Sequence, residues 1–536
     1  MKKSISMVLT LVLVLSMVCI AMADGLSDLG FHESGMPIVD KEITLRGVAK
    51  QGANVGDFND MVFFDEMGKL TNVHIEWEMI PSEAWNEKIG LMLATGTDLP
   101  DIFYGHGCLT TDKVVEYGNQ GYFVDMKPYI EKYGENLKIL TQEVTGLLDA
   151  ATTPSGAIYA LPAVHGIASN ANNALFLNKI WLDKLGLEVP TTTEEFVEVL
   201  RAFKNGGDLN GNGLDDEIPY SFLPGDSVNG IYPLFGAFGR VDNGNHLVTE
   251  NGKVIFTAIE PEYKEAVKWF HQLAEEGLID QECYSQDVSM LWSKIQQENP
   301  NVGCASFWTA QWATGAETIE EANKTWVPVA PLIGPAGVQL WEQIDTSVFN
   351  MCAFAITSSC KYPEIAFRWG DYQYSVDAAR DCNFGPLGVC VKQNEDGSYE
   401  WVEEVNGEPL SSNLIRAKYA PMNYGIFANP PSRWVFEYNY FGATENEKNI
   451  VLNGSVYGPY QTANYFPTMY QTDEEVEVIS NLKTDINSLV AEKTAKWIMD
   501  GGVDEEWDAY LEQLKIIGID EYLAAYESAY DRYLGK

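Results

Sequence analysis

Hydrophobic and polar positions along the first third of the chain follow the order strand, helix, strand, helix, strand. Apolar residues recur at every second position in the expected strands and at every third or fourth position in the expected helices. The expected elements are a strand at 43–48, a helix at 57–70, a strand at 73–77, a helix at 84–94 and a short buried strand at 99–104. This order predicts a mainly parallel sheet with helices on both faces, which is an α/β fold. Ligands of such sheets bind beyond the carboxyl ends of the strands, so the loop Tyr104–Gly107 is expected to line a cleft.

A second α/β block follows residue 160. Thr191–Glu195 has the spacing of a capping box, which predicts a helix that starts there and ends near Lys204. We also expect an amphipathic helix at 262–276, a buried strand at 302–307 and a strand–helix unit at 349–377. The chain from about Asp473 onward is expected to be helical, with an aromatic stripe that packs in the core: Tyr510, Tyr522, Tyr526, Tyr530 and Tyr533.

The length, composition and net charge of the chain exclude several classes of protein. A chain of 536 residues favours more than one folded unit, because single cores stop growing at about 250–300 residues. With 46% hydrophobic and 21% charged residues, the composition excludes a disordered chain and a multi-span membrane protein. The formal net charge of -42 repels phosphate backbones, so no nucleic-acid partner is expected.

Residues 1–23 have the features of a secretory signal peptide. Lys2 and Lys3 precede an apolar run from Met7 to Ile20, and the small-residue site Ala21-Met22-Ala23 follows. We therefore expect the mature protein to be secreted, at the cell surface or in a periplasm. Cys19 raises the alternative of a lipid anchor, but Val18 stands where a small residue is expected, which disfavours it.

Seven cysteines remain after residue 23, at positions 108, 283, 304, 352, 360, 382 and 390. An odd number leaves at least one thiol unpaired within a monomer. The spacing contains no C-x-x-C and no Cys/His cluster, so a zinc site is not expected. We expect most of these cysteines to be small buried hydrophobic residues.

The segment 208–217 predicts a structural calcium site. Oxygen-bearing residues fall at alternate positions, and glycines allow the loop to turn sharply, as in the first half of an EF-hand. The candidate ligands are Asp208, Asn210, Asn212, the Leu214 carbonyl, Asp216 and Glu217. Position twelve of the loop is Pro219, so Glu217 would have to close the shell in place of the usual Glu. The alternative is a metal-free turn, for which Asp, Asn and Gly are also preferred.

The chain resembles the family 1 extracellular solute-binding proteins of ABC importers, in the large branch of LplA-like lipoproteins and alginate-oligosaccharide-binding proteins. The resemblance extends over nearly the whole mature chain. The matching segments are 74–77, 94–101, 156–162, 178–186, 208–219 and 276–280. In this branch the Asp-x-Asn-x-Asn loop is similar to a known calcium-binding element.

The resemblance implies a two-lobed periplasmic-binding-protein-like fold of type II, similar to the maltodextrin-binding proteins. It assigns residues 24–165 to the first lobe, 166–345 to the second, 346–388 to a return segment of the first and 389–536 to the second. Hinge strands would cross between the lobes near 161–174, 345–351 and 384–389. A ligand that touches both lobes favours the closed state, which the transmembrane subunits of the importer recognise. We expect the protein to be a monomer.

Aromatic residues at strand ends are the candidate ligand-binding groups, because sugars present apolar faces that stack on flat rings. Trp308 and Trp312 follow the strand expected at 302–307, in a position similar to a sugar-stacking Trp of maltodextrin-type relatives. Further candidates are Tyr104, His165, Trp292 and Trp341, whereas His106 is as readily explained as a surface loop residue. The expected ligand is an oligosaccharide, with a neutral sugar slightly favoured over a uronate.

Two other functions fit the same features. A secreted glycosidase or lyase needs only two carboxylates on a cleft, although the chain contains no G-x-S-x-G, H-E-x-x-H or P-loop motif. The same receptor could instead carry a peptide or another polar nutrient. The leading interpretation is a non-catalytic receptor that delivers an oligosaccharide to an ABC importer.

Overall fold

The structure is a computed structural model. It describes residues 25–52, 55–144, 146–164, 173–316, 319–342, 349–395, 397, 399–426, 428, 455–462 and 464–535. The signal peptide expected at 1–23 lies outside these residues. No helix within the described parts of the chain is both long and apolar enough to cross a membrane.

The chain divides into two compact units. Unit 1 comprises the described parts of Met1–Ile167, Val348–Gly442 and Tyr470–Thr472. Unit 2 comprises those of Ala168–Ser347, Ala443–Met469 and Asp473–Lys536. Each unit contains its own sheet and buried core.

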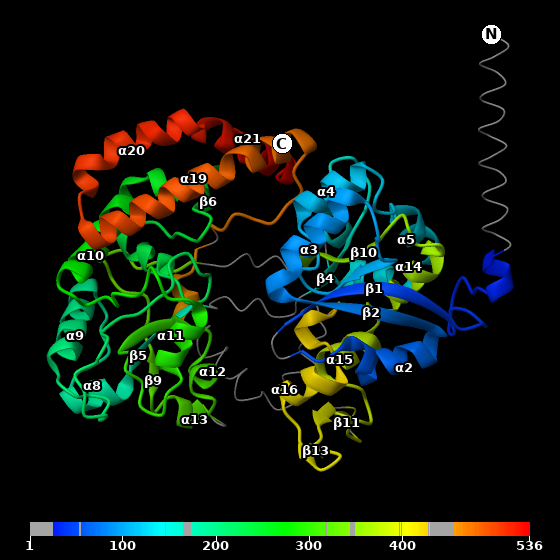
Figure 1. Cartoon of the computed structure of the whole chain (residues 1–536), viewed down its shortest axis with the longest axis horizontal. Coiled ribbons are helices and arrows are strands. Elements are labelled where there is room, and N and C mark those ends of the chain that lie inside the picture. Colours follow the sequence, from blue (N-terminus) through cyan, green and yellow to red (C-terminus); the bar gives the residue numbers. More distant parts are fainter. Residues whose placement is uncertain are drawn as a thin grey trace, which may run out of the picture. The chain divides into compact units, whose positions relative to one another are not determined.

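Unit 1 is built on a five-stranded sheet of order β2-β1-β3-β10-β4 (Figure 1). Its strands are β1 (Ile43–Gln51), β2 (Val73–Pro81), β3 (Ile102–Tyr104), β4 (Leu161–Val164) and β10 (Phe349–Ile356). β1 pairs in parallel with β2 and β3, as the sequence predicted, and β10 pairs antiparallel with β3 and β4.

The helices of unit 1 cover both faces of this sheet. Leu45 and Ala49 of β1 pack in one core with Met67 of α2 (Val62–Thr71), whereas Val48 packs in another with Trp85 of α3 (Ser82–Thr95). This alternation follows from the two-residue period of a strand and gives the two-sided packing that the sequence predicted. The remaining helices are α4 (Thr111–Asn119), α5 (Lys127–Tyr133), α6 (Glu135–Glu143), α7 (Leu147–Ala151), α14 (Pro363–Tyr372), α15 (Val376–Phe384) and the short turn η1 (Phe58–Asp60).

The segment from 389 to 428 differs from the domain assignment made from the sequence. It was assigned to the second lobe after a crossing near 384–389, but its described residues belong to unit 1. The reason is packing, because Cys390, Val391, Ile415 and Ile426 are buried in the core of unit 1. Its elements are β11 (Val391–Gln393), β12 (Tyr399–Trp401), β13 (Glu404–Val405), β14 (Glu408–Pro409), α16 (Ser412–Leu414), the π-helical turn η4 (Ile415–Tyr419) and η5 (Met422–Tyr424).

Unit 2 contains a three-stranded antiparallel sheet of order β8-β5-β9. The strands are β5 (Ala174–Asn178), β8 (Cys304–Phe307) and β9 (Trp326–Pro328), and a separate hairpin joins β6 (Leu247–Glu250) to β7 (Lys253–Phe256). The predicted capping box is confirmed, because the side chain of Thr192 accepts from the backbone N–H of Glu195 at 3.1 Å and begins α9 (Thr193–Asn205). Other helices are α8 (Lys179–Leu185), α10 (Pro261–Glu275), α11 (Val288–Ile295), α12 (Ala310–Thr314), α13 (Ile319–Ala322), and the turns η2 (Tyr232–Phe238), η3 (Thr257–Ile259) and η6 (Gly458–Tyr460).

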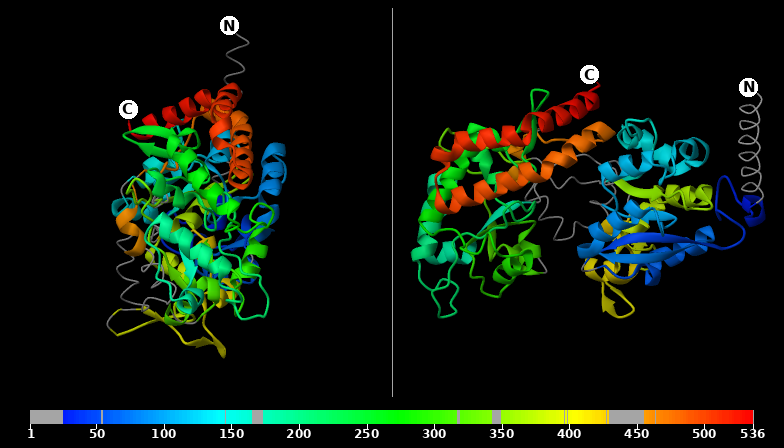
Figure 2. Two further views of the ribbon diagram at one scale, coloured as in Figure 1. Left: turned by 90° about the vertical axis from the view of Figure 1, so that its left-hand side faces the viewer. Right: turned by 45° about the horizontal axis from the view of Figure 1, so that its top comes forward.

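The C-terminal part of the chain adds a helical layer to unit 2. Helices α19 (Asp473–Asp500), α20 (Val503–Ile517) and α21 (Ile519–Tyr533), orange to red in Figure 2, pack together and against α10. Tyr510, Tyr522, Tyr526 and Tyr530 are buried in the core, as expected, whereas Tyr533 is 55% exposed.

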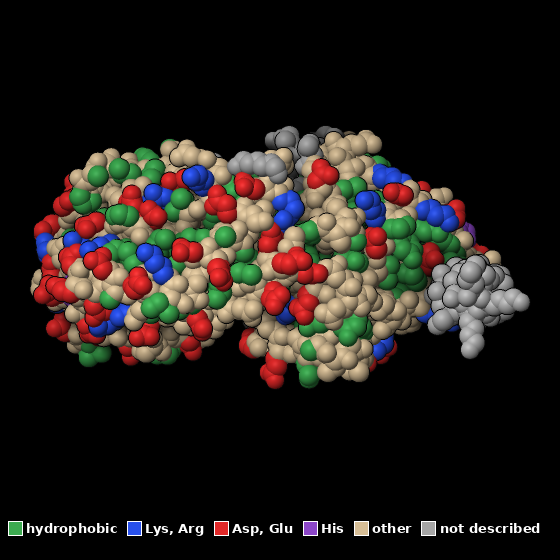
Figure 3. Space-filling view, turned by 90° about the horizontal axis from the view of Figure 1, so that it is seen from above, with side chains coloured by type: hydrophobic (Ala, Val, Ile, Leu, Met, Phe, Trp, Pro, Cys, Tyr) green, Lys and Arg blue, Asp and Glu red, His purple; other side chains and the backbone are tan. Residues whose placement is uncertain are grey.

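The seven described cysteines are all buried, and none forms a disulfide with another. Burial raises the pKa of the Cys352 and Cys360 thiols to about 12, which keeps them in the thiol form at neutral pH. Acidic side chains are spread over the face seen in Figure 3 rather than gathered in one patch.

Candidate ligand-binding and metal sites

The carboxyl ends of β1 and β3 meet at one edge of the unit 1 sheet, because the two strands are parallel. The loop after β3 is held there by Asn350 at the start of β10. Gly107 N–H donates to Asn350 Oδ1 at 3.2 Å, and Asn350 Nδ2 lies 3.4 Å from His106 Nε2. Burial, with the charge of Lys50, lowers the pKa of His106, so its imidazole is neutral at neutral pH. This edge offers polar groups of both donor and acceptor type.

Tyr104 does not occupy the position expected of a ligand-binding residue. Its ring is fully buried and packs against Trp77 at 5.1 Å and Trp369 at 5.7 Å between ring centroids. Its hydroxyl accepts from the backbone N–H of Ile426 at 3.3 Å and lies 3.4 Å from Gln373 Oε1. The aromatic ring is therefore explained by the core of unit 1, since it has no exposed face for a sugar.

Trp308 lies directly after β8 in unit 2 and is 38% exposed. It is the one tryptophan with an exposed side chain among those whose side chains the structure describes. Phe307, the preceding residue, is fully buried and stacks on Phe176. The strand end thus presents a partly exposed indole beside a buried, stacked ring. Trp312 belongs to α12, but its side chain is outside the described part of the chain.

Two of the other candidates, Trp292 and Trp341, are buried. Trp292 is buried on α11, with its ring centroid 6.3 Å from that of Phe307. Trp341 is 2% exposed and packs on Tyr457 at 4.6 Å. These two positions are explained by core packing rather than by ligand contact. His165 lies outside the described residues.

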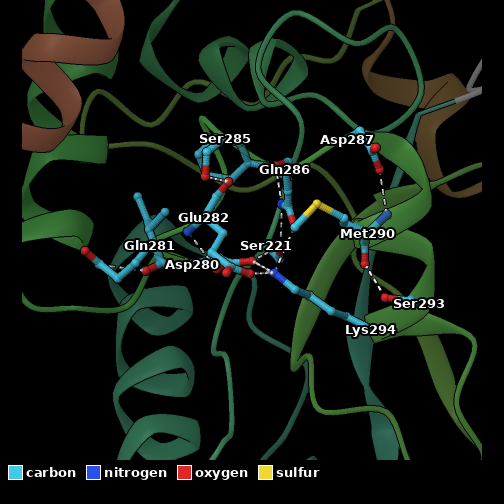
Figure 4. Close-up of polar contacts among 12 residues, drawn as sticks. Ser221, Asp280, Gln281, Glu282, Ser285, Gln286, Asp287, Met290, Ser293 and Lys294 are labelled. Carbon is cyan, nitrogen blue, oxygen red and sulfur yellow. Dashed lines mark hydrogen bonds and ion pairs between the residues drawn. The ribbon is translucent and has the colours of Figure 1, made fainter.

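A polar network centred on the buried Asp280 lies next to β8, because Ser221 donates its backbone N–H to the carbonyl of Cys304 at 3.1 Å (Figure 4). Lys294 of α11 donates to Asp280 Oδ2 at 2.8 Å, to Glu282 Oε2 at 2.8 Å and to Gln286 Oε1 at 2.9 Å. Ser221 donates to Asp280 Oδ2 at 2.6 Å. Burial alone would lower the pKa of Lys294, but its hydrogen bonds to Asp280 and Glu282 outweigh burial and raise it. The network joins α11, the segment after α10 and the strand-like segment that follows the 208–217 loop.

The 208–217 loop is wrapped by its own side chains. Asp208 accepts from the backbone N–H of Gly211 at 2.7 Å and of Gly213 at 2.9 Å. Gly213 has φ +83°, the left-handed conformation that an EF-hand turn requires at position six. Asn212 Nδ2 donates to Asp216 Oδ1 at 3.0 Å. These internal hydrogen bonds close the loop in this structure.

Glu217 gives the clearest test of whether this loop fits a metal ion. Its Oε1 accepts from the N–H groups of Leu209 at 2.5 Å and Asn210 at 3.2 Å, whereas its Oε2 is buried with no hydrogen-bond partner. A buried unpaired carboxylate oxygen is costly unless a cation satisfies it. No group of three or more His, Cys, Asp or Glu side chains gathers as a metal site in the described residues, so amide and carbonyl oxygens would have to complete the shell. The donor set is all oxygen, which suits Ca²⁺.

Comparison with known proteins identifies the family to which this chain is similar. A profile of the bacterial extracellular solute-binding protein family matches residues 56–380. The fructooligosaccharide ABC transporter substrate-binding protein FusA of Streptococcus pneumoniae serotype 4 is 31% identical over 510 residues, which cover 93% of this chain and 91% of that protein.

Two solved structures of FusA show the same fold. One, in complex with kestose, has a TM-score of 0.80 and 31% identity and covers 92% of this chain and 100% of that chain. The other, an EF-hand mutant in complex with fructo-nystose, has a TM-score of 0.81 and 30% identity at the same coverage. The chain therefore belongs to the bacterial extracellular solute-binding protein family.

Proposed function

We propose that this protein is the substrate-binding component of an ABC importer for neutral fructooligosaccharides. The carrying observation is the match to FusA along almost the whole of both chains, together with a TM-score of 0.80 to its kestose complex. Kestose carries no charge, which agrees with the slight preference for a neutral sugar drawn from the sequence. The family is one of binding proteins, so the glycosidase or lyase alternative is set aside, and the ligand leaves chemically unchanged.

Trp308 is the proposed stacking platform in unit 2. Its indole is exposed at a strand end, directly after the buried Phe307. A sugar ring presents C–H groups to such a face and keeps its hydroxyls for polar neighbours. Trp312, four residues further along, is a second candidate from the sequence.

We also propose that the 208–217 loop binds Ca²⁺. Asp208, Asn210, Asn212, the Leu214 carbonyl, Asp216 and Glu217 would hold the ion. The buried Oε2 of Glu217 and the EF-hand mutant described for FusA support this proposal. Calcium bound there would neutralise the loop carboxylates and hold the loop closed, a structural rather than a ligand-binding role.

The family match supports a proposal for export and for the importer partner. We propose that residues 1–23 are removed on secretion and that the mature protein, as a monomer, delivers its ligand to the transmembrane subunits of the importer. Closure of the two units around the ligand, which the resemblance implies, stays a prediction that small-angle scattering with and without ligand can test.

A thermal-shift screen tests the ligand class. Kestose, nystose, maltotriose, trigalacturonate and a tripeptide are compared at equal concentration with purified mature protein. A ligand that binds only the folded state raises Tm, by an amount set by its concentration relative to Kd. We expect a rise with kestose and nystose only. A rise with trigalacturonate or the peptide, and none with the fructose oligomers, would contradict the proposal.

A further inference from the structure

The segment Ile415–Ile426 packs closely on the strand ends of the unit 1 sheet. Gly56, which follows β1, donates its backbone N–H to the carbonyl of Arg416 at 3.0 Å. Beyond β3, a Cβ on Gly105 would lie only 2.3 Å from the carbonyl oxygen of Tyr424. Such approaches are open only to glycine. The segment is thus held at the carboxyl edge of β1 and β3, where ligands of parallel sheets bind.

Backbone atoms make these contacts, and among the described residues the side chain of Arg416 forms no hydrogen bond or ion pair. Arg416 lies in the π-helical turn η4, a rare element that is frequent at functional sites. Its side chain is partly exposed, and its Nε–H is buried without a hydrogen-bond partner. Burial lowers the pKa of the guanidinium, although the nearby Tyr424 opposes this.

The other described arginines are all paired, which is the expected state in a chain with 77 acidic residues. Five form ion pairs with carboxylates and one donates to backbone carbonyls: Arg46 with Asp98, Arg201 with Glu276, Arg240 with Glu250, Arg380 with Asp377, Arg532 with Glu475, and Arg368 with the carbonyls of His32 and Gly35. Among the residues that the structure describes, Arg416 makes neither kind of contact. A partly buried guanidinium without a partner is costly, so a ligand that pairs with it would offset that cost.

We propose that Arg416 is a ligand-contacting residue of unit 1, whose guanidinium donates to neighbouring hydroxyl oxygens of the bound oligosaccharide. This inference rests on the proposed function and adds one contact between the protein and its oligosaccharide. The planar fork of an arginine presents parallel N–H groups, which match two acceptor oxygens on adjacent carbons of a sugar ring. A lysine offers a point charge and cannot reproduce that geometry.

The test compares Arg416→Gln and Arg416→Lys with the matched control Arg46→Gln, using calorimetric titration with kestose. Arg46 is also in unit 1, but its partner is the exposed Asp98. We expect R416Q to weaken kestose binding at least tenfold and R416K at least threefold, with R46Q within twofold of wild type. The Tm of unliganded R416Q should stay close to that of wild type, because the substitution removes no side-chain hydrogen bond or ion pair among the described residues.

The outcomes separate this inference from the proposed function. If wild-type protein does not bind kestose, the proposed function fails, and the inference fails with it. If wild type binds kestose and both Arg416 variants bind it within twofold, only the inference is overturned. If R416Q lowers Tm, the R416K variant gives the answer. A stably folded R416K that binds kestose with wild-type affinity would overturn the proposed bidentate contact. A stably folded R416K that binds kestose more weakly would support it. Binding of trigalacturonate that depends on Arg416, without binding of kestose, contradicts the assignment to hydroxyl groups.

Discussion

The ring of Phe307 stacks face to face on that of Phe176, with centroids 4.2 Å apart and planes 4° apart. The two residues belong to the paired strands β8 and β5, and both rings are buried. This pair holds the end of β8 in place, so the backbone that carries the exposed indole of Trp308 is well supported. A rigid aromatic face loses little conformational entropy when a sugar stacks on it.

Replacement of Trp308 should therefore affect binding more than folding. We expect W308A to weaken kestose binding by at least tenfold in calorimetric titration, while W308F keeps part of the affinity. Because the side chain is 38% exposed, the free energy of unfolding should fall by less than about 1 kcal/mol.

Tyr533 provides the control for that variant, since it is another exposed aromatic residue of the same chain. Y533A should bind kestose as wild type does. Equal affinity of W308A and wild type would show that Trp308 is not the platform.

Calcium should stabilise the folded protein through the 208–217 loop. Chelation with EDTA should lower Tm, and E217Q should reduce both the Tm rise with added Ca²⁺ and the calcium affinity measured by titration. At a calcium concentration of 100 times Kd the gain is about 2.7 kcal/mol. D183N, at an exposed carboxylate outside the loop, should respond to Ca²⁺ as wild type does. An identical Tm in EDTA and in Ca²⁺, with no heat of binding, would contradict a metal site here.

The two carboxylates on Lys294 should contribute very differently to stability. Asp280 is buried and its side chain is 4% exposed, whereas that of Glu282 is 55% exposed. D280A leaves a mostly buried ammonium and the hydroxyl of Ser221 without this partner, so we expect a loss of about 3–5 kcal/mol. E282A, the matched control, should cost about 0–1 kcal/mol because its pair is solvated. Urea unfolding measures both, and similar losses would mean that the buried network is not the stabilising element.

The outcome at these positions shows what a sequence can predict. The parallel pairing of β1 with β2 and the start of α9 follow from local spacing and capping, which are properties of neighbouring residues. Trp308 was predicted at a strand end by the same logic. The burial of Tyr104 and Trp341 was not predictable, because large aromatic rings suit both a core and a sugar platform.

The position of 389–428 and of Arg416 depended on contacts between distant segments. The sequence of short strands and turns with few apolar residues does not indicate which of the two cores they pack against. Only the folded chain shows that Gly56 and Gly105 admit the backbone of 416–424, and that the Nε–H of Arg416 is buried without a hydrogen-bond partner.

Glu342 should make stability depend on pH. Burial, with the charge of Asp242, raises its pKa to about 8, above the value of about 4.3 in an unfolded chain. Between these values the folded state holds a proton that the unfolded state has lost, so this group lowers stability as pH rises from about 4.3 to 8. E342Q should therefore have a higher Tm than wild type at pH 8, with a difference that shrinks toward pH 5. A difference that is the same at both pH values would contradict a raised pKa at Glu342.

The most direct test of the central claim is a calorimetric titration of the mature wild-type protein with kestose, followed by chromatography of the recovered sugar. The account predicts saturable binding of one kestose per chain, and recovery of the trisaccharide intact after prolonged incubation. Absence of binding to kestose and longer fructose oligomers, or release of fructose and sucrose from the recovered sugar, would contradict it.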